Sequence, residues 1–274
     1  MNLGSVILDQ LKRDRILDLL KEGKRIDGRA LDEQRQLSIE TGVIPKANGS
    51  ARVKLANTEV ITGVKIQPDK PFPDLGDKGI LICTAEILPL ADPNVEPGPP
   101  TEDVIELARV VDRGIRETEM IDLHQLVLKE NKSVIGLFID SSIINADGNL
   151  FDACSYASVA AILSCTVPKY EIKDEAPVLV EGVTSKAPVQ TLPVSVTMAR
   201  IGDYIVVDPT TEEEACMDSR ITITTNSEGN ICALQKGGSN GFTVDQLVRC
   251  SEIALSVGTK IRKRLEQLMQ DGKE

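Results

Sequence analysis

The strongest constraint on the fold is a pattern that occurs twice: a hairpin signal, further strands, and then a helix. In the first half, SARVKL and TEVITGVKI alternate apolar and polar residues around Ala56-Asn57, which is typical of a β-hairpin. In the second half, TLPVSVTMARI and DYIVVDP flank Gly202-Asp203 in the same way. This repetition predicts an α+β fold of two similar hairpin-plus-helix halves in one compact domain.

The predicted organisation follows from these two halves. Residues 1–24 contain an N-terminal helix, 25–168 form the first half, and 190–274 form the second half with a C-terminal helix from Thr243. Residues 169–190 are expected to be irregular, and no linker is long enough to make the halves independent domains. No signal peptide or membrane-spanning run is recognised, so we expect a cytoplasmic protein.

The composition limits the chemistry that the chain can perform. The net charge of −11 excludes nucleic-acid binding through bulk charge, so any such binding needs a local basic patch. The six cysteines include no CxxC pair, and there is a single histidine, His124. A zinc site of mixed ligands and a Ser-His-Asp triad are therefore disfavoured, and the cysteines are expected to be reduced core thiols.

A helix that begins after Thr101 carries the densest arginine cluster. Arg109, Arg113 and Arg116 are spaced i, i+4 and i+7, which places them on one helix face. They are candidates for binding phosphate groups. A solvated surface in which Asp112 and Glu117 neutralise them is an equally good interpretation of the spacing.

An acidic cluster and a glycine turn are the other candidates for chemistry. The acids are Asp208, Glu212, Glu213, Glu214 and Asp218, and such carboxylates can transfer protons or bind Mg²⁺, although a solvated acidic turn explains them as well. The turn ADGN at 146–149 precedes a helix expected at 150–166, where free N–H groups can attract phosphate. However, residues 149–151 are Asn-Leu-Phe, which favours a structural role.

The order of several motifs resembles the RNase PH family over nearly the whole chain. These motifs are RIDGR, GSARVKLANTEVITGVK, PFPD, ELARVVDRGIRE, ADGNLFDACSYAS, VVDPTTEEE and ICALQKGG. Within the family, the chain is most similar to the non-catalytic RNase PH-like subunits of archaeal exosome rings. The resemblance implies phosphorolysis of RNA in a ring of six RNase PH-like units.

The chain departs from the active members of the family at two places. Active members hold phosphate with a Gly-Ser/Thr-Arg run where this chain has Asn149-Leu150-Phe151. Of their two aspartate positions, Glu214 matches the first, and Asp218 is nearest the second with a spacing two residues shorter. We therefore expect no catalytic residue, no metal and no cofactor in this chain.

The resemblance implies a function through partners. The chain is expected to be a non-catalytic subunit of a hexameric 3'-5' RNA-degrading ring. It would alternate with a catalytic RNase PH-like subunit, bind RNA-binding cap proteins, and contact single-stranded RNA through Arg109, Arg113 and Arg116. The alternative is a phosphate-dependent exoribonuclease active in its own right through Asp208, Glu214 and Asp218. A third interpretation, a metabolic α+β enzyme unrelated to RNA, is supported only by the acidic cluster, and the order of the motifs argues against it.

Overall fold

The first half of the chain is built on a six-stranded sheet. The computed structural model describes residues 3–271. Five strands follow in the order β1 (Leu37–Thr41), β2 (Gly49–Leu55), β3 (Thr58–Asp69), β6 (Ser133–Asn145) and β4 (Ile80–Ile87), and β5 (Val127–Lys129) pairs with β6. All pairings are antiparallel except β4 with β6. The connection from β4 to β6 passes through helix α2 (Glu102–Glu117) and the short 3₁₀ helix η1 (Leu123–Leu126).

The second half is built on a four-stranded antiparallel sheet. Its strands follow in the order β10 (Tyr204–Val207), β9 (Val194–Ile201), β11 (Ser219–Thr225) and β12 (Ile231–Gly237). The short helix α4 (Thr211–Cys216) joins β10 to β11, and the long helix α5 (Val244–Asp271) packs against β9 and β11. The two hairpins that the repeated pattern predicts, β2–β3 and β9–β10, are therefore present, one in each sheet.

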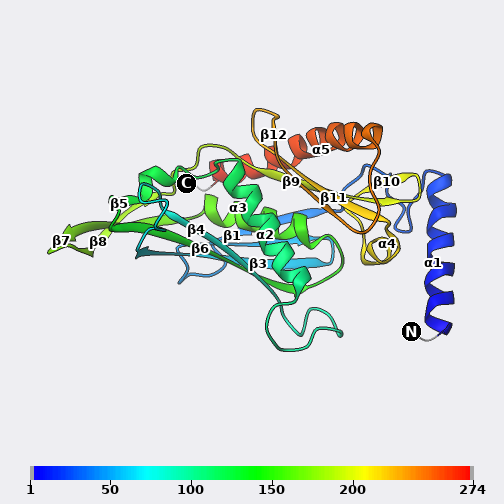
Figure 1. The fold of residues 1–274 in the computed structure, drawn as a ribbon, viewed down its shortest axis with the longest axis horizontal. Coiled ribbons are helices and arrows are strands. Elements are labelled where there is room, and N and C mark those ends of the chain that lie inside the picture. Colours follow the sequence, from blue (N-terminus) through cyan, green and yellow to red (C-terminus); the bar gives the residue numbers. More distant parts are fainter. Residues whose placement is uncertain (1–2, 272–274) are drawn as a thin grey trace.

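Helix α3 (Leu150–Leu163) joins the two halves, since it packs against β2 and β3 of one sheet and β9 of the other (Figure 1). Residues 151–162 of this helix are all buried, and many are Ala or Ser, whose small side chains permit close approach. Ser155 donates to Ser195 Oγ at 3.0 Å, and the Tyr156 hydroxyl donates to the Ser195 carbonyl at 2.8 Å. One aliphatic core cluster includes residues from both halves.

Helix α1 (Leu3–Lys21) stands at the side of the second half (Figure 1). Its Ile16 and Leu20 are buried in a smaller apolar cluster with Ile201 and Val206. The helix is thereby fixed against β9 and β10 of the second sheet.

One expectation about the connection between the halves is wrong. Residues 169–190 were expected to be irregular, but β7 (Thr166–Lys173) and β8 (Ala176–Lys186) form an antiparallel hairpin that projects from the body (Figure 1). Its turn places Asp174 and Glu175 at φ angles of 48° and 68°, where Asp is better tolerated than most residues. Most of β8 is exposed, so the hairpin lacks the apolar alternation that identifies a half-buried strand.

The helix starts agree with the sequence in part. Thr243 and Gln246 form the expected capping box, since each backbone N–H donates to the other side chain. Thr101 is the N-cap residue of α2, but its side chain makes no capping hydrogen bond. The acidic run of Glu212, Glu213 and Glu214 lies in the helix α4, whose start is fixed by a capping box between Thr210 and Glu213.

Across the described residues, no helix combines the length and apolar character that crossing a membrane requires.

Candidate functional site: a closed cluster and an arginine face

The start of helix α3, where the resemblance to the RNase PH family implies a phosphate site, lies beside a cluster of arginines from the segment 25–35. Arg25 pairs with Glu213 in a fully buried ion pair, and its Nη1 also donates to the carbonyl of Val207 at 2.7 Å. Arg29 donates to Asp208 at 3.1 Å. The arginines of the first half therefore neutralise acids of the second half.

Asp208 is the centre of this cluster. Its carboxylate is completely buried and accepts from the backbone N–H, Nε and Nη2 of Arg35 at 2.8–2.9 Å, from Arg29 Nη1, and from Asn149 Nδ2 at 2.8 Å. Burial alone would lower the pKa of Arg35, but the hydrogen bond and charge of Asp208 raise it. Arg35 and Asp208 therefore stabilise each other's charged form, and the buried carboxylate of Asp208 is not accessible to a substrate.

The glycine turn before α3 is also occupied by internal groups. Arg35 donates to the carbonyls of Asp147 and Gly148 at 2.5 and 3.1 Å. A Cβ on Gly148 would lie 2.6 Å from the backbone N of Thr211, so the turn is in close contact with the start of α4. The turn therefore fixes the two halves against each other.

The anion position at the start of α3 is filled by a carboxylate of the chain itself. The backbone N–H of Asn149, the N-cap residue of α3, donates to Glu214 Oε1 at 2.9 Å. Burial raises the pKa of Glu214, while this hydrogen bond acts in the opposite direction. Because the N–H that could bind a phosphate oxygen already has an anionic acceptor, an incoming phosphate would have to displace Glu214.

Phe151 lies where active members of the RNase PH family have their phosphate-binding Gly-Ser/Thr-Arg run, and it is packed in the interior as the sequence predicts. Phe151 is buried, and the guanidinium carbon of Arg220 lies 3.9 Å from its ring centroid. Arg220 also pairs with Glu106 at 3.1 Å. The stacking of Arg220 on Phe151 joins α3 to β11, and the sequence analysis did not identify it.

The five acids of the predicted cluster do not converge. Asp208, Glu213 and Glu214 lie in the closed cluster, but Glu212 is exposed. Asp218 accepts from Arg13 of α1 at 2.9 Å and from the N–H of Gly202 at 2.7 Å. In the part of the chain that the structure describes, no group of three or more His, Cys, Asp or Glu residues could hold a metal ion.

A buried acid that the sequence analysis missed makes stability depend on pH. Asp152 is fully buried and accepts from Thr197 Oγ1 at 2.7 Å, from the Thr197 N–H at 3.0 Å and from Asn149 Nδ2 at 2.8 Å. Burial nevertheless raises its pKa to about 7, against an ordinary value of 3.8. The folded chain therefore holds this proton more tightly than the unfolded chain does.

We expect the substitution Asp152→Asn to remove one component of the pH dependence. Below pH 3.8 the carboxyl group is protonated in both states, and between 3.8 and about 7 only the folded state keeps the proton. The free energy of unfolding of the natural chain should therefore fall with rising pH over this window, relative to D152N. The slope should reach roughly 1.4 kcal/mol per pH unit. Urea unfolding of both proteins from pH 4 to 8 measures it, and parallel curves would contradict the prediction.

The three arginines of α2 lie together beside one hollow of about 430 Å³. Arg109 is exposed and makes no hydrogen bond or ion pair with any described residue. Arg113 donates to Gln235 at 2.8 Å, and Arg116 pairs with Asp112 at 2.8 Å. The shared face is as the spacing predicts, but only Arg109 and Arg113 lack an acidic partner.

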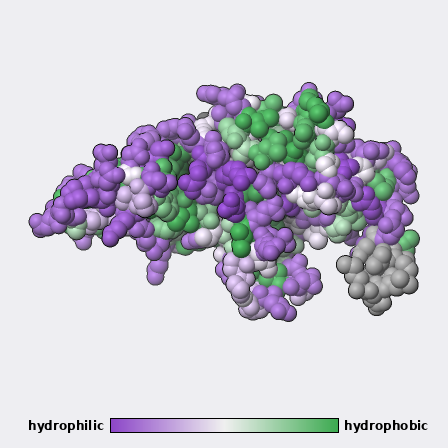
Figure 2. Space-filling model, in the orientation of Figure 1, coloured by the Kyte–Doolittle hydropathy of each residue, from purple (hydrophilic) through white to green (hydrophobic). Residues whose placement is uncertain are grey.

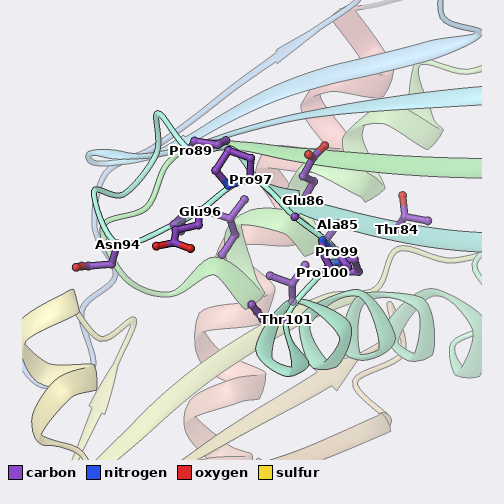
Figure 3. Close-up of a pocket in the computed structure, with 14 residues that line it drawn as sticks. Thr84, Ala85, Glu86, Pro89, Asn94, Glu96, Pro97, Pro99, Pro100 and Thr101 are labelled. Carbon is purple, nitrogen blue, oxygen red and sulfur yellow. The ribbon is translucent and has the colours of Figure 1, made fainter.

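A larger hollow, of about 670 Å³, lies beyond the N-terminal end of the same helix (Figure 3). A proline-rich loop, residues 92–100, forms one side of it, and Glu86 and Glu96 are its charged residues. Residues 79–108 contain no Lys, Arg or His. This hollow is therefore unsuited to a polyanion, in contrast to the arginine hollow.

Comparisons with known proteins agree with this architecture. Residues 33–168 match domain 1 of the 3' exoribonuclease family, RNase PH, and residues 191–257 match its domain 2. In solved structures, an Archaeoglobus fulgidus exosome with RNA bound to the active site contains a chain 44% identical. It matches with a TM-score of 0.87 over 94% of this chain and 99% of that one. A chain of an archaeal exosome core is 39% identical, with a TM-score of 0.84, over 96% of this chain and 100% of that one.

Sequence relatives give the same result. The exosome complex component Rrp42 of Thermococcus gammatolerans is 46% identical over 94% of this chain and 95% of its own length. That of Methanothermobacter thermautotrophicus is 46% identical over 96% of this chain and 97% of its own length. The fold and both domain matches thus define an RNase PH-like protein. The chain belongs to the 3' exoribonuclease family, as its motif order indicated.

Proposed function

We propose that the chain is a non-catalytic subunit of a hexameric 3'-5' RNA-degrading exosome ring. It alternates with a catalytic RNase PH-like subunit, structures that partner's phosphorolytic site and positions RNA. The observation that carries the proposal is the hydrogen bond from the Asn149 N–H to Glu214. Attacking phosphate would need this N–H as a hydrogen-bond donor, but a carboxylate of the chain already accepts from it.

The surrounding charges support the lack of catalysis. Phosphorolysis requires cations that stabilise phosphate as it attacks. The guanidinium groups of Arg25, Arg29 and Arg35 are bound to Glu213 and Asp208, and that of Arg220 is paired with Glu106. An active site built from Asp208, Glu214 and Asp218 is not favoured, because Asp208 is fully buried and Asp218 is paired with Arg13.

Assembly with partners is supported by the relatives and by the surface. The relatives are exosome components, and the neighbouring structures are exosomes. Figure 2 shows hydrophobic residues gathered over β12 and the start of α5, where Ile231, Leu234, Val244 and Val248 are exposed. Exposed apolar patches of this kind mark protein contacts. We assign them to ring neighbours, expect RNA-binding cap proteins on the ring, and place the complex in the cytoplasm.

RNA positioning is assigned to the arginine face. Arg109, Arg113 and Arg116 share one hollow on a chain of net charge −11, and the guanidinium of Arg109 has no partner among residues 3–271 whose side chains the structure describes. Phosphate groups of single-stranded RNA are the anions that such a face would bind beside a neighbouring subunit's active site.

We expect the triple substitution R109E/R113E/R116E to weaken RNA binding by the assembled complex and to slow RNA shortening. Each lost phosphate contact should flatten the dependence of log affinity on log salt by roughly 0.7. Fluorescence anisotropy with single-stranded RNA at several salt concentrations measures both quantities, and light scattering should show an intact ring.

A matched control separates local contacts from net charge. R249E/K260E/K263E makes the same charge change on exposed residues of α5 and should leave the salt dependence near that of the natural complex. If the α2 variant degrades RNA at the natural rate across salt concentrations, its arginines are a solvated surface.

A further inference from the structure

Phe72 separates two hollows beside the arginine face. The arginine hollow, of about 430 Å³, and a second hollow of about 300 Å³ share Phe72, Leu81 and Arg116 in their walls. Because the same three side chains line both, the hollows adjoin and form one groove. Arg109 lines only the first hollow, and His124 lines only the second.

The exposure of Phe72 has no explanation within the chain. The protein has four Phe, three Tyr and no Trp, all among the described residues, and Phe72, at 45% exposed, is the only one of these seven that is neither buried nor half-buried. Its loop is restrained by Pro71 and Pro73 on either side and by a hydrogen bond from the Leu75 N–H to the Phe72 carbonyl at 3.0 Å. An aromatic ring is thus presented to solvent on a restrained backbone.

Cationic side chains lie on both sides of the ring, with acids beside them. Arg109 and Arg113 line the first hollow together with Asp112 and Glu117, and Lys78 lines the second together with Glu119 and Asp122. Aromatic rings between cations are the chemistry by which proteins bind single-stranded nucleic acid, because the bases stack and the phosphates are neutralised. The acidic hollow at the other end of α2 has no cation and no aromatic residue in its wall.

We propose that Phe72 stacks on a base of single-stranded RNA whose phosphates are held by the arginine face. The inference rests on the proposed function and adds to it a second kind of contact, one that does not involve charge. Because every base has a π face, the contact tolerates any sequence. Phe72 is a positioning residue, since it fixes the RNA strand in the groove without touching the reacting atoms.

The test compares two substitutions of Phe72 in the complex with the catalytic partner. Leu keeps an apolar side chain but has no π face, whereas Trp keeps one. With fluorescein-labelled oligoadenylate, in EDTA and without phosphate, F72L should weaken binding by about 5- to 100-fold, and F72W should restore it. The salt dependence should stay unchanged in F72L, since stacking releases no counterions. L90A, which changes an exposed apolar residue outside both hollows, should bind normally.

The outcomes separate this inference from the function on which it rests. If R109E/R113E/R116E loses affinity while F72L binds as the natural complex does, the stacking contact is wrong and the proposed function stands. If light scattering shows that F72L no longer assembles while F72W does, Phe72 contacts a neighbouring subunit instead of RNA, and the inference is overturned. If F72W binds as poorly as F72L, the ring has no stacking role.

Discussion

The substitution Asp208→Asn is expected to destabilise the folded chain by about 3–5 kcal/mol. Asn has nearly the same shape and tolerates the left-handed backbone at this position, where φ is 52°. It removes the negative charge that Arg29 and Arg35 share, and it replaces one carboxylate oxygen, which accepts from N–H groups, by an NH2 donor. The guanidinium of Arg35 would then be buried without an ion-pair partner at the contact between the halves, while Arg29 would keep its pair with Asp27. Urea unfolding of the isolated chain at neutral pH measures the loss.

Asp218→Asn is the matched control. It is the same chemical change, ten residues later, in a pair with Arg13 whose side chains are 27% and 18% exposed. Solvent screens such a pair, so the loss should be about 1 kcal/mol or less. Equal losses in the two variants would show that the Asp208 cluster is no more important to folding than a surface ion pair.

The repeated sheets could be predicted because their signals are local. In β2 and β3 the buried and exposed positions alternate, and the turn at Ala56 adopts a φ of 51°. The β7–β8 hairpin could not be recognised in the same way, because water faces most of β8 and its residue pattern is not set by a core. The pairing of β7 with β8 depends on the turn at Asp174 and Glu175. The sequence allows the conformation of this turn but does not specify it.

The sequence alone predicts which phosphate-binding groups are missing from the candidate site. Asn149, Leu150 and Phe151 offer no guanidinium or hydroxyl to a phosphate, and this is visible in the sequence alone. The ion cluster that closes the site was not predictable, because Arg25 and Glu213 are separated by 188 positions. A signal was nevertheless present: a locally basic segment at 12–35 and an acidic one at 169–219 require neutralisation somewhere in the fold.

The arginine face shows the same division. Helical spacing predicts that Arg109, Arg113 and Arg116 share a face, and they line one hollow. Spacing does not reveal that Asp112 pairs with Arg116, nor that the loop carrying Phe72 forms the facing wall. Loop positions follow from tertiary packing, for which one sequence holds no periodic signal.

The central claim is that the chain has no phosphorolytic activity of its own. The direct measurement is the release of nucleoside diphosphates from single-stranded RNA in phosphate and Mg²⁺. It compares the chain alone, the catalytic RNase PH-like partner alone, and their mixture, with light scattering to confirm that the mixture is one complex. Loss of a single oxyanion donor slows catalysis by about 100- to 1,000-fold, so the chain alone should release diphosphates at least about 100-fold more slowly than the mixture. Steady release by the pure chain at a rate comparable to the mixture would contradict the account.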